Sequence, residues 1–420
     1  MSWRLHTSGG PTVEVASALF SLSDRFLEAL GRSRCGPDRK NNGAAPIGKI
    51  TTLAIQSNSN NQTEGAMATS KNESMPAASG ESRACIAFLL GDCTGIGPEL
   101  VAKVLADGKM AEHARLVVVG DARVLQRGIR DAKASFKWNI VEGVPEIDWN
   151  NGSVPLIDLK NLDPAVFPQG VGSAESGKLT GETLAYAIEL AKKGHVDAIT
   201  FAPLNKKALY DGGWKFRDEH QMFASLLGHK GHFSEMNVLD GQWMTRVTSH
   251  VSLRQAVDMI TPQRIEESLK LADAAMKAAG IEKPRIAVAA LNPHNGENGL
   301  FGTEEIEIIR PTVEKMAAQG IDCKGPFASD TVYIKAFEGA FDSVLSMYHD
   351  QGQIATKLKG FNRGVTITAG LRTVFTTPSH GTAFDIVGKG IANTGATENA
   401  IMLAAQMTKT SIARLQLVTD

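Results

Sequence analysis

The sequence predicts an α/β protein in which a mostly parallel or mixed sheet is flanked by helices. Short apolar runs at 86–90, 116–119 and 196–201 have the length and composition of buried strands. A segment between these runs, at 180–193, repeats apolar residues at helical spacing. Alternation of strands and helices is typical of this class, because the connecting helices cover the faces of the sheet.

Residues 1–82 differ in composition from the rest of the chain. Polar stretches at 57–63 and 75–80 have too little apolar surface to offset the entropy of ordering, so we expect disorder there, with one short amphipathic helix at 13–30. The arginines of this segment suggest a transit peptide as an alternative, although its acidic residues are unusual for that class. Another alternative is an upstream extension of the reading frame, with Met67 or Met75 near the usual start. The predicted domains are therefore an extension over 1–82 and a folded region over 83–420.

The first predicted strand, at 86–90, runs into a glycine-rich turn. Pro98 follows this turn and is well placed for the first turn of a helix. The glycines at 91, 95 and 97 do not have the G-x-G-x-x-G spacing of a dinucleotide-binding fingerprint. The turn therefore predicts only a close approach of the backbone to another part of the molecule.

Two further helices are predicted from their end signals. Thr261 followed by Pro262 is typical of a helix start, and the helix is expected to run to about residue 279 and to stop at Gly280. Another helix is expected to begin at Thr303 and to be interrupted near Pro311.

Charge, apolar runs and cysteine usage exclude several classes of protein. The chain has 420 residues, enough for two domains with sizeable cores, and a formal net charge of -1. Such a balance provides no basic surface for nucleic acid or an acidic membrane, so we expect neither as a partner. No run approaches about 18 apolar residues, so no segment is expected to span a bilayer. The four cysteines have no Cys-x-x-Cys spacing, which argues against disulfides and structural zinc and favours a cytoplasmic protein.

Three histidines that close apolar runs are the strongest candidates for a functional cluster. His250 ends the run 247–250, His294 ends 286–294, and His349 follows 343–347 just before a Gly turn. Ligands bind at strand ends in α/β sheets, and three imidazoles hold a divalent metal while leaving a position open for substrate or water. The sequence therefore predicts a metal site, with three unrelated histidines as the alternative.

Six ordered segments within 85–407 resemble the 4-hydroxythreonine-4-phosphate dehydrogenase family of vitamin B6 synthesis. They are Gly91-Asp92-x-x-Gly95-Ile96-Gly97-Pro98-Glu99, Ala202-Pro203-Leu204-Asn205-Lys206, Val247-Thr248-Ser249-His250, Asn292-Pro293-His294-Asn295-Gly296-Glu297, Tyr348-His349-Asp350-Gln351-Gly352 and His380-Gly381-Thr382-Ala383. The resemblance implies an isocitrate/isopropylmalate dehydrogenase-like α/β/α fold with two interleaved subdomains and an active site in the cleft between them. It also implies a homodimer whose active sites use both subunits.

The resemblance further implies oxidation of a secondary alcohol with NAD, and one divalent ion held by the three histidines. Zinc, manganese, magnesium and cobalt all suit such a site. The ion would lower the pKa of the substrate hydroxyl, and it could stabilise an enolate if a 3-oxo acid loses carbon dioxide. Asp330 and Asp350 are expected to orient the ligands, with turn roles as the alternative. Lys206 is a candidate for proton handling, with a surface salt bridge as the alternative, and Lys357 for binding an anionic group.

The segment 380–393 resembles the loop that wraps the adenosine half of NAD in the isopropylmalate dehydrogenase superfamily. The residues expected to bind the cofactor are His380, Gly381, Thr382, Ala383, Asp385 and Asn393. Asp385 and the lack of a basic cluster favour NAD over NADP, although Lys389 weakens that preference. The alternative is that the glycines of this loop serve only turns.

The sequence departs from the family at the residues that bind the substrate. The family's Gly-His-Thr-Glu segment appears as Asp218-Glu219-His220-Gln221, so only His220 is carried over, as a polar contact. The phosphate-binding Asn and Arg fall at Thr366 and Phe375, and a phenyl ring cannot replace a bidentate guanidinium. Arg372 is the nearest replacement.

We therefore expect a metal-dependent, NAD-linked dehydrogenase of a small anionic secondary alcohol. An unphosphorylated dihydrodiol carboxylate or another hydroxy acid is the alternative substrate. A non-catalytic metabolite-binding protein of the same fold is the alternative class.

Overall fold

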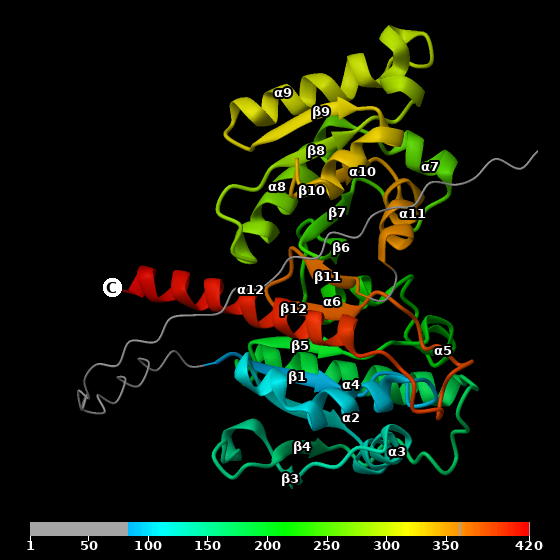
Figure 1. Cartoon of the computed structure of the whole chain (residues 1–420), viewed down its shortest axis with the longest axis vertical. Helices are drawn as coiled ribbons and strands as arrows, with labels where there is room; N and C mark the ends of the chain where they lie inside the picture. Colours follow the sequence, from blue (N-terminus) through cyan, green and yellow to red (C-terminus); the bar gives the residue numbers. More distant parts are fainter. Residues whose placement is uncertain (1–82, 361–362, 420) are drawn as a thin grey trace, which may run out of the picture. The chain divides into compact units, whose positions relative to one another are not determined.

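A computed structural model describes residues 83–360 and 363–419, and the helix expected at 13–30 lies outside these ranges. The described residues form one mixed sheet of twelve strands in the order β3-β4-β2-β1-β5-β12-β11-β6-β7-β10-β8-β9 (Figure 1). The strands are β1 (Cys85–Leu89), β2 (Arg115–Gly120), β3 (Trp138–Val141), β4 (Val154–Asp158), β5 (Ala198–Phe201), β6 (Ser234–Leu239), β7 (Gln242–Arg246), β8 (Ile286–Ala289), β9 (Cys323–Phe327), β10 (Ser343–Ser346), β11 (Val365–Ala369) and β12 (Val374–Pro378).

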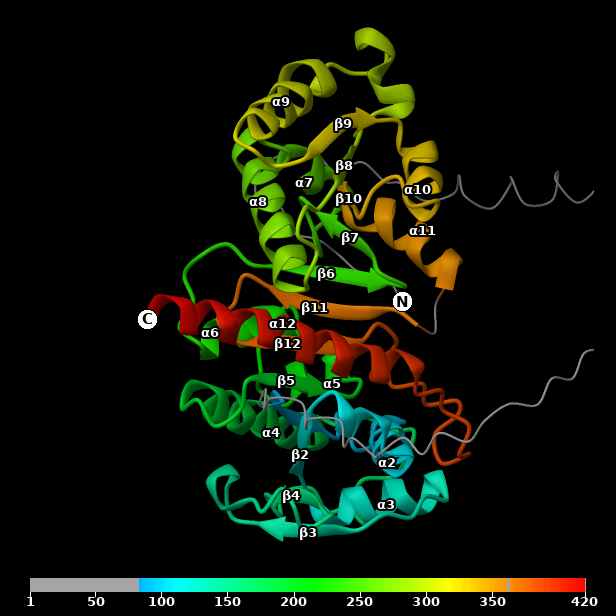
Figure 2. The same cartoon turned by 60° about the vertical axis from the view of Figure 1, so that its left-hand side comes forward.

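Helices connect most of these strands and pack along the sheet (Figure 2). They are α2 (Gly97–Asp107), α3 (Ala122–Ala132), α4 (Ala174–Lys192), α5 (Lys206–Asp211), α6 (Glu219–Leu226), α7 (Leu253–Asp258), α8 (Pro262–Ala278), α9 (Arg310–Ala318), α10 (Ser329–Phe337), α11 (His349–Gly360) and α12 (Gly395–Thr419). Short 3-10 turns occur at Lys109–Glu112 and Val144–Glu146, a left-handed turn occurs at Pro293–Gly299, and a π-helical turn occurs at Glu305–Ile309.

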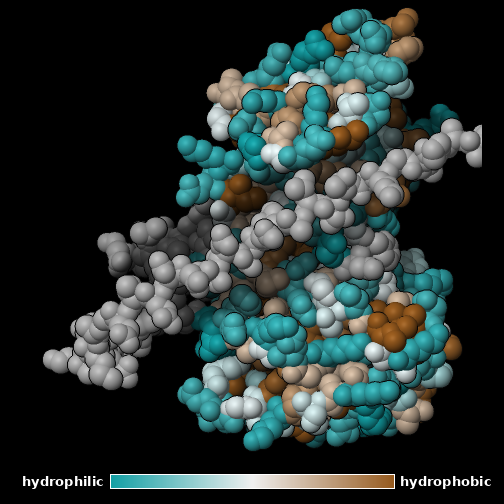
Figure 3. All heavy atoms as spheres, in the orientation of Figure 1, coloured by the Kyte–Doolittle hydropathy of each residue, from teal (hydrophilic) through white to brown (hydrophobic). Residues whose placement is uncertain are grey.

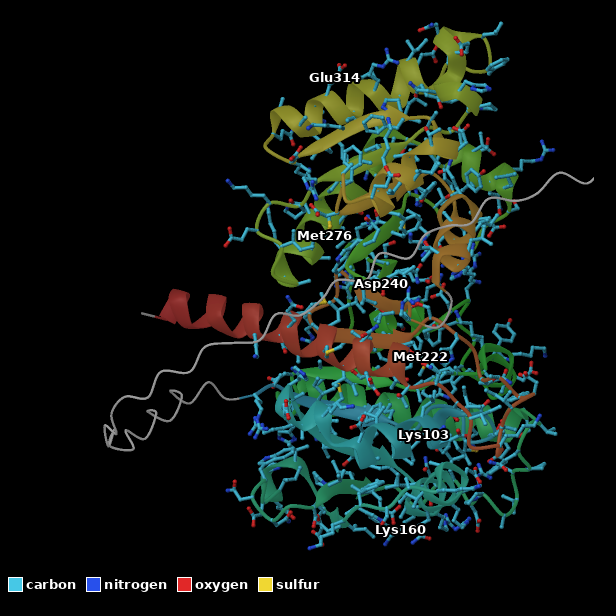
Figure 4. All side chains as sticks on the ribbon, viewed as in Figure 1. Lys103, Lys160, Met222, Asp240, Met276 and Glu314 are labelled. Carbon is cyan, nitrogen blue, oxygen red and sulfur yellow. The ribbon has the colours of Figure 1, made fainter. Side chains whose placement is uncertain are left out.

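Both faces of the sheet are buried at strands such as β1 and β8, which explains why these strands are continuously apolar instead of alternating. In β1, Ile86 and Phe88 pack in one core while Ala87 and Leu89 pack in another on the opposite face. Strand β8 is buried in the same way, with successive residues in two different cores. Met222 of α6 and Met276 of α8 belong to two of these cores (Figure 4). The predicted α/β class with a mixed, helix-covered sheet is therefore confirmed.

Most of the predicted elements are confirmed, with small changes at their ends. The strands expected at 86–90, 116–119 and 196–201 are β1, β2 and β5. The helix expected at 180–193 is α4, which begins earlier because Ser173 and Ser176 form a reciprocal capping box with N–O distances of 3.0 and 3.1 Å.

The two helices predicted from their end signals are also present. Helix α8 begins after Thr261, whose hydroxyl accepts the Arg264 backbone N–H at 3.3 Å, and it ends before Gly280, which has a φ of 89°. The interruption expected near Pro311 is a change of helix type, because the π-helical turn Glu305–Ile309 passes directly into α9 there.

The middle of the sheet is antiparallel, and this arrangement positions the site. Strand β11 pairs with β12 on one side and with β6 on the other, and β6 pairs with β7, all antiparallel. Strand β12 also runs parallel to β5, where the Thr376 and Thr200 hydroxyls lie 2.8 Å apart. These strands join two parallel parts of the sheet, one on either side of the candidate site.

The surface of the described residues shown in Figure 3 is mostly hydrophilic, with hydrophobic side chains in separate groups. Within these residues no helix combines the length and the apolar character needed to cross a bilayer.

Candidate active site

A cavity of about 220 Å³ lies where β5, β6, β11 and β12 meet the start of α11. This volume is below the roughly 300–1,000 Å³ of sites for drug-sized ligands, so it suits a small metabolite. Four charged side chains, two histidines from the predicted cluster and several hydroxyls line it. The polar lining residues are Lys206, Glu219, Glu235, Asn237, His250, His349, Gln353, Lys357, Thr366, Thr377, Ser379 and His380.

Two of the three predicted metal ligands lie next to each other. The ring centroids of His250 and His349 are 5.4 Å apart, and both side chains are about two-thirds buried. Both also line a second cavity of about 200 Å³, whose wall includes Leu253 and Tyr348. His250 has a φ of 49°, an unfavourable backbone conformation that is concentrated at functional sites. The structure therefore brings these two histidines to one wall between two cavities.

The third predicted ligand, His294, is not part of this pair. It lies in the turn Pro293–Gly299, where His294 to Asn298 all have a positive φ. Its ring is tilted by 45° to that of Phe301, with centroids 6.0 Å apart. Buried Glu305 holds this turn by accepting the backbone N–H groups of Leu291 and Asn292 at 2.8 and 2.7 Å. Within the described part of one chain, no three His, Cys, Asp or Glu side chains are arranged to hold a metal ion.

Each paired histidine has a carboxylate on its Nδ1 atom, which leaves Nε2 directed elsewhere. Asp218 Oδ2 lies 2.9 Å from His250, and Asp350 Oδ1 lies 2.7 Å from His349. Such a contact fixes the ring and the tautomer of a metal-binding histidine. Burial lowers the pKa of His349, which favours the neutral imidazole that binds metals. Asp350 thus contacts His349, whereas Asp330 is exposed in the first turn of α10 and has no described contact with the three histidines; that these carboxylates orient metal ligands stays a prediction.

A buried ion pair lies at one side of the cavity. The Glu235 carboxylate has Oε1 at 3.6 Å from the Arg246 guanidinium, and Asn237 and Gln353 also contact Arg246. Burial works to raise the pKa of Glu235, but Arg246 and then His220 and other cations outweigh burial and lower it to about 2. Glu235 is therefore ionised at neutral pH.

Lys206 lies at the start of α5 and pairs with Glu219, at 3.0 Å between Nζ and Oε2. Burial works to lower the pKa of Lys206, but Glu219, Glu235 and Asp218 outweigh it and raise the pKa above its usual value. The predicted proton-handling residue therefore carries a proton and can donate, but it is a poor base. Lys357 lines the same cavity from the last turn of α11.

The positions that differ from the family pattern have specific roles in this fold. The Thr366 hydroxyl contacts Asn237 and Ser379, both at 2.9 Å. Phe375 is fully buried and stacks on Phe223 with centroids 4.2 Å apart. Arg372 is exposed in the turn between β11 and β12 and does not line the cavity. Within the described chain Arg372 therefore does not reach this cavity, and its role as a replacement phosphate contact stays a prediction.

His220, the residue carried over from the altered segment, is buried behind the cavity. Its Nδ1 lies 2.6 Å from the Thr368 hydroxyl, and its Nε2 lies 3.7 Å from Glu235 Oε2. His220 does not line the cavity itself, so it would act on a substrate indirectly, through the neighbouring carboxylate of Glu235.

The predicted cofactor loop follows β12 and packs against the glycine-rich turn and α2. His380 and Gly381 line the cavity, Thr382 accepts the Ile96 backbone N–H at 3.1 Å, and Ala383 has a φ of 44°. A side chain at Gly95 would approach Thr382 to 2.8 Å, which explains the glycine. Asp385 and Asn393 are exposed farther along the loop.

Lys103 on α2 anchors the far end of this loop (Figure 4). Its ammonium donates to the backbone carbonyls of Gly390 and Ala392 at 2.9 and 2.8 Å, and Glu99 accepts the Ala392 N–H at 2.8 Å. The loop is therefore held at both ends.

Sequence reasoning missed the buried polar group of Glu235, Asn237 and Arg246, and the carboxylate of Asp218. One signal was available. In β6, Glu235 and Asn237 alternate with Met236 and Val238, so two polar side chains share one face of an otherwise apolar strand.

The fold and the cavity define an α/β protein with a site for a small polar ligand, which Phe201 and Thr377 line from the carboxyl ends of β5 and β12. Comparison with known proteins is more specific. A family model described as "Pyridoxal phosphate biosynthetic protein PdxA" matches residues 112–404, and the chain belongs to this family.

Relatives and solved structures agree with this assignment. D-threonate 4-phosphate dehydrogenase of Pectobacterium atrosepticum is 40% identical over 323 residues, which are 77% of this chain and 98% of that protein. The crystal structure of 4-hydroxythreonine-4-phosphate dehydrogenase from Klebsiella pneumoniae is 38% identical, with a TM-score of 0.68 over 77% of this chain and 99% of that one. A terephthalate 1,2-cis-dihydrodiol dehydrogenase from Burkholderia xenovorans is 26% identical, with a TM-score of 0.55 over 77% and 98%. The chain is an oxidoreductase of the dehydrogenase type that acts on a CH–OH group.

Proposed function

We propose that the chain is a metal-dependent, NAD-linked dehydrogenase of a small anionic secondary alcohol. The observation that carries the proposal is the pair of His250 and His349 at the wall of a cavity that Lys357 also lines, each histidine with a carboxylate on Nδ1. This donor set suits a divalent ion, because a carboxylate at each Nδ1 orients the two rings and leaves each Nε2 as a possible ligand. When bound, the ion would lower the pKa of the substrate hydroxyl and NAD would accept the hydride.

The residues of this chain would bind the substrate and handle its proton. Lys357 attracts an anionic group, and the ammonium of Lys206 donates a hydrogen bond beside Glu219. The proton of the substrate hydroxyl needs an acceptor in the cavity. Glu219 and Glu235 provide the two carboxylates of the described lining. Relatives with phosphorylated substrates favour 4-hydroxythreonine 4-phosphate or D-threonate 4-phosphate, and the dihydrodiol dehydrogenase favours an unphosphorylated carboxylate.

We propose a homodimer in which His294 of a second copy completes the metal site. His294 lies apart from the histidine pair in its own chain, on a turn that Glu305 holds firmly. Leu300 and Phe301 beside it are 72% and 48% exposed, and Ile354 and Leu358, on the helix that begins with His349, are 59% and 84% exposed. Apolar side chains next to both halves of the ligand set are typical of surfaces that a second copy covers.

The cofactor proposal places NAD along the loop that begins at His380. Its fit to this chain depends on small residues near the cavity, on Thr382 packed against Gly95 and on the anchor at Lys103. Asp385 is exposed on the loop, where a carboxylate suits a ribose hydroxyl better than a 2'-phosphate.

The test is metal content and dehydrogenase activity of the purified full chain. We expect one divalent ion per chain, a dimer by light scattering, and reduction of NAD by a hydroxy acid. His349→Ala should abolish activity and metal binding, and His294→Ala should do the same. A mixture of the two inactive variants should regain part of the activity, because one of the two sites in a mixed dimer has all three ligands. Full activity of a metal-free preparation would refute the metal requirement, and no recovery in the mixture would refute the shared site.

A further inference from the structure

Another cavity lies at the amino ends of three neighbouring strands. Its volume is about 350 Å³, against about 220 Å³ for the cavity beside the histidines. Residues at the starts of β2 and β4 and just before β3 line it, together with the end of α2 and the turn that follows α2. We propose that this cavity binds a small aromatic carboxylate, a ligand distinct from the substrate and the cofactor of the dehydrogenase reaction.

The cavity is remote from the residues at which the proposed function places a metal ion and the His294 of a second copy. In the order of the sheet, β1, β5, β12, β11 and β6 separate β2 from β7, the strand that precedes His250. Six strand spacings of about 4.8 Å correspond to roughly 29 Å. The cavity also lies at the amino ends of its strands, whereas the candidate active site lies at the carboxyl ends of β5 and β12. The metal ion therefore adds no charge to this lining.

Three cations line the cavity without acidic neighbours. They are Arg83, Arg115 and Lys137, and the described lining contains no aspartate or glutamate. The two guanidiniums contact backbone carbonyls only: Arg83 donates to Ala111, and Arg115 Nε donates to Arg83 at 3.0 Å. Among the described residues, the Nη atoms of Arg115 and the ammonium of Lys137 have no hydrogen-bond or ion-pair partner. These donors are therefore available to an anion.

The register of the strands brings two of these cations together. Continuing the parallel pairing of β2 with β4 places Arg115 opposite Ser153, and continuing the pairing of β3 with β4 places Lys137 opposite the same serine. Paired residues of neighbouring parallel strands lie about 4.8 Å apart and direct their side chains to the same face. A single carboxylate at Ser153 can therefore accept hydrogen bonds from both cations.

The rest of the lining is largely apolar and partly aromatic. Leu105 and Leu116 are buried in one of the hydrophobic cores, and Phe136 packs against that core. Trp149 is half-buried, and the Arg115 guanidinium lies over its ring, 5.1 Å from the centroid. Rings of this kind pack well against the ring of a ligand. An inorganic anion would leave the apolar wall exposed to water, whereas an aromatic carboxylate covers the wall and pairs with the cations.

The experiment is calorimetric titration of the purified full chain, without substrate, with 4-phenylbutyrate as the probe. Two matched compounds separate its parts, because 4-phenylbutanamide has the ring without the charge and butyrate has the charge without the ring. We expect one molecule of 4-phenylbutyrate per chain with a Kd below about 1 mM. The amide should bind at least about tenfold more weakly, since charge-assisted hydrogen bonds change affinity by roughly ten- to a hundredfold. Butyrate should also bind at least about tenfold more weakly, because it buries no ring.

Variants test whether the probe binds in this cavity. Lys137→Gln should weaken binding of 4-phenylbutyrate by about threefold, because the side chain is exposed, and Arg115→Gln by about tenfold. The double variant should bind the acid no more tightly than the amide. Lys160→Gln is the matched control, because this exposed lysine follows the carboxyl end of β4, and it should leave the Kd within about twofold. Thermal unfolding checks the fold, and Lys137→Gln alters only an exposed side chain, so it tests the proposal without the Arg115 variants.

Four results would overturn the proposal. Equal affinities for the acid and the amide would show that the cavity attracts only the apolar body. A Kd above about 1 mM for 4-phenylbutyrate would show that the full chain has no such site. Unchanged affinity in folded Lys137→Gln and Arg115→Gln proteins would place the probe elsewhere, and loss of binding in His349→Ala would place it beside the histidines. Each of these results leaves the dehydrogenase proposal intact, because that proposal is tested by metal content and NAD reduction.

Discussion

Replacing Asp218 by Asn should weaken metal binding at the proposed site by about ten- to sixtyfold. The Asp218 carboxylate lies 2.9 Å from His250 Nδ1 and is only 8% exposed. Burial works to raise the pKa of Asp218, but the hydrogen bond with His250 and further contacts outweigh burial and lower it from 3.8 to about 2. That shift corresponds to roughly 2.5 kcal/mol in favour of the ionised form. If the contact with His250 accounts for between half and all of this free energy, the affinity for the metal ion changes by about ten- to sixtyfold.

Asp350→Asn is the matched control. Asp350 makes the same contact with His349, at 2.7 Å, but it is 74% exposed, so water screens its charge and the expected loss is below about threefold. Asn at position 218 keeps the start of α6 capped, because its side-chain oxygen can still accept the Gln221 N–H that Asp218 accepts at 2.9 Å. Affinity is measured by competition with a chromophoric chelator, and folding by thermal unfolding. Equal losses at both positions, or an unchanged affinity in a folded Asp218→Asn protein, would show that burial of the carboxylate does not control the metal ligand.

Further predictions concern stability, the substrate and the cofactor. Because the pKa of Glu235 is lowered to about 2, the ionised carboxylate should contribute its full stability above about pH 4.5 and should lose it as the pH falls toward 2. The free energy of unfolding in urea should therefore change less between about pH 6 and about pH 3 in Glu235→Gln than in the parent protein. Phe375→Ala should lower the free energy of unfolding by about 3–5 kcal/mol, since it removes a fully buried ring stacked on Phe223, whereas Phe375→Leu should cost less; similar urea midpoints for the two variants would contradict this. Arg372→Ala should leave KM for every anionic substrate within about twofold, because the side chain is exposed away from the cavity, and a large rise would place it at the site after all. Lys103→Met should raise KM for NAD without changing KM for the hydroxy acid, because it releases the carbonyls of Gly390 and Ala392; equal effects on both constants would argue against a cofactor role of the loop.

The α/β class and the elements with clear local signals, among them β1, β2, β5 and α8, could be predicted from the sequence, because these strands are continuously apolar and this helix has clear end signals. Thr261 and Gly280 define α8 almost to the residue. The antiparallel middle of the sheet could not be predicted in this way. Its pairings join residues far apart in the sequence, such as Thr366 with Asn237, and no local pattern specifies that register.

The candidate site was predicted only in part, for the same reason. His250 and His349 follow apolar runs, and their meeting at one wall follows from the parallel pairing of β7 with β10. The ion pair of Glu235 and Arg246 depends on the antiparallel register of β6 and β7. Asn237 faces Met244 in that register, and its continuation places Arg246 opposite Glu235.

Arg372 shows that closeness in the sequence does not predict which residue reaches the cavity. Three residues along a strand span about 10 Å, and the turn after β11 carries Arg372 away from the cavity, although Phe375 is close to it in the chain.

The position of β12 between β5 and β11 has a consequence for how the protein is made. Strands β1 to β5 leave the ribosome long before β12, the strand that pairs with β5. Thr376 of β12, whose hydroxyl contacts that of Thr200 in β5, follows Thr200 by 176 residues in the sequence. Helix α12, which packs against β12, β5 and β1, is made last of all. During synthesis β5 therefore remains an open strand edge that can pair with other chains, a state that is prone to aggregation. Production of the enzyme should accordingly depend on chaperones or on slow synthesis, and nonsense mutations that remove only β12 and α12 should yield insoluble protein instead of a shorter soluble one.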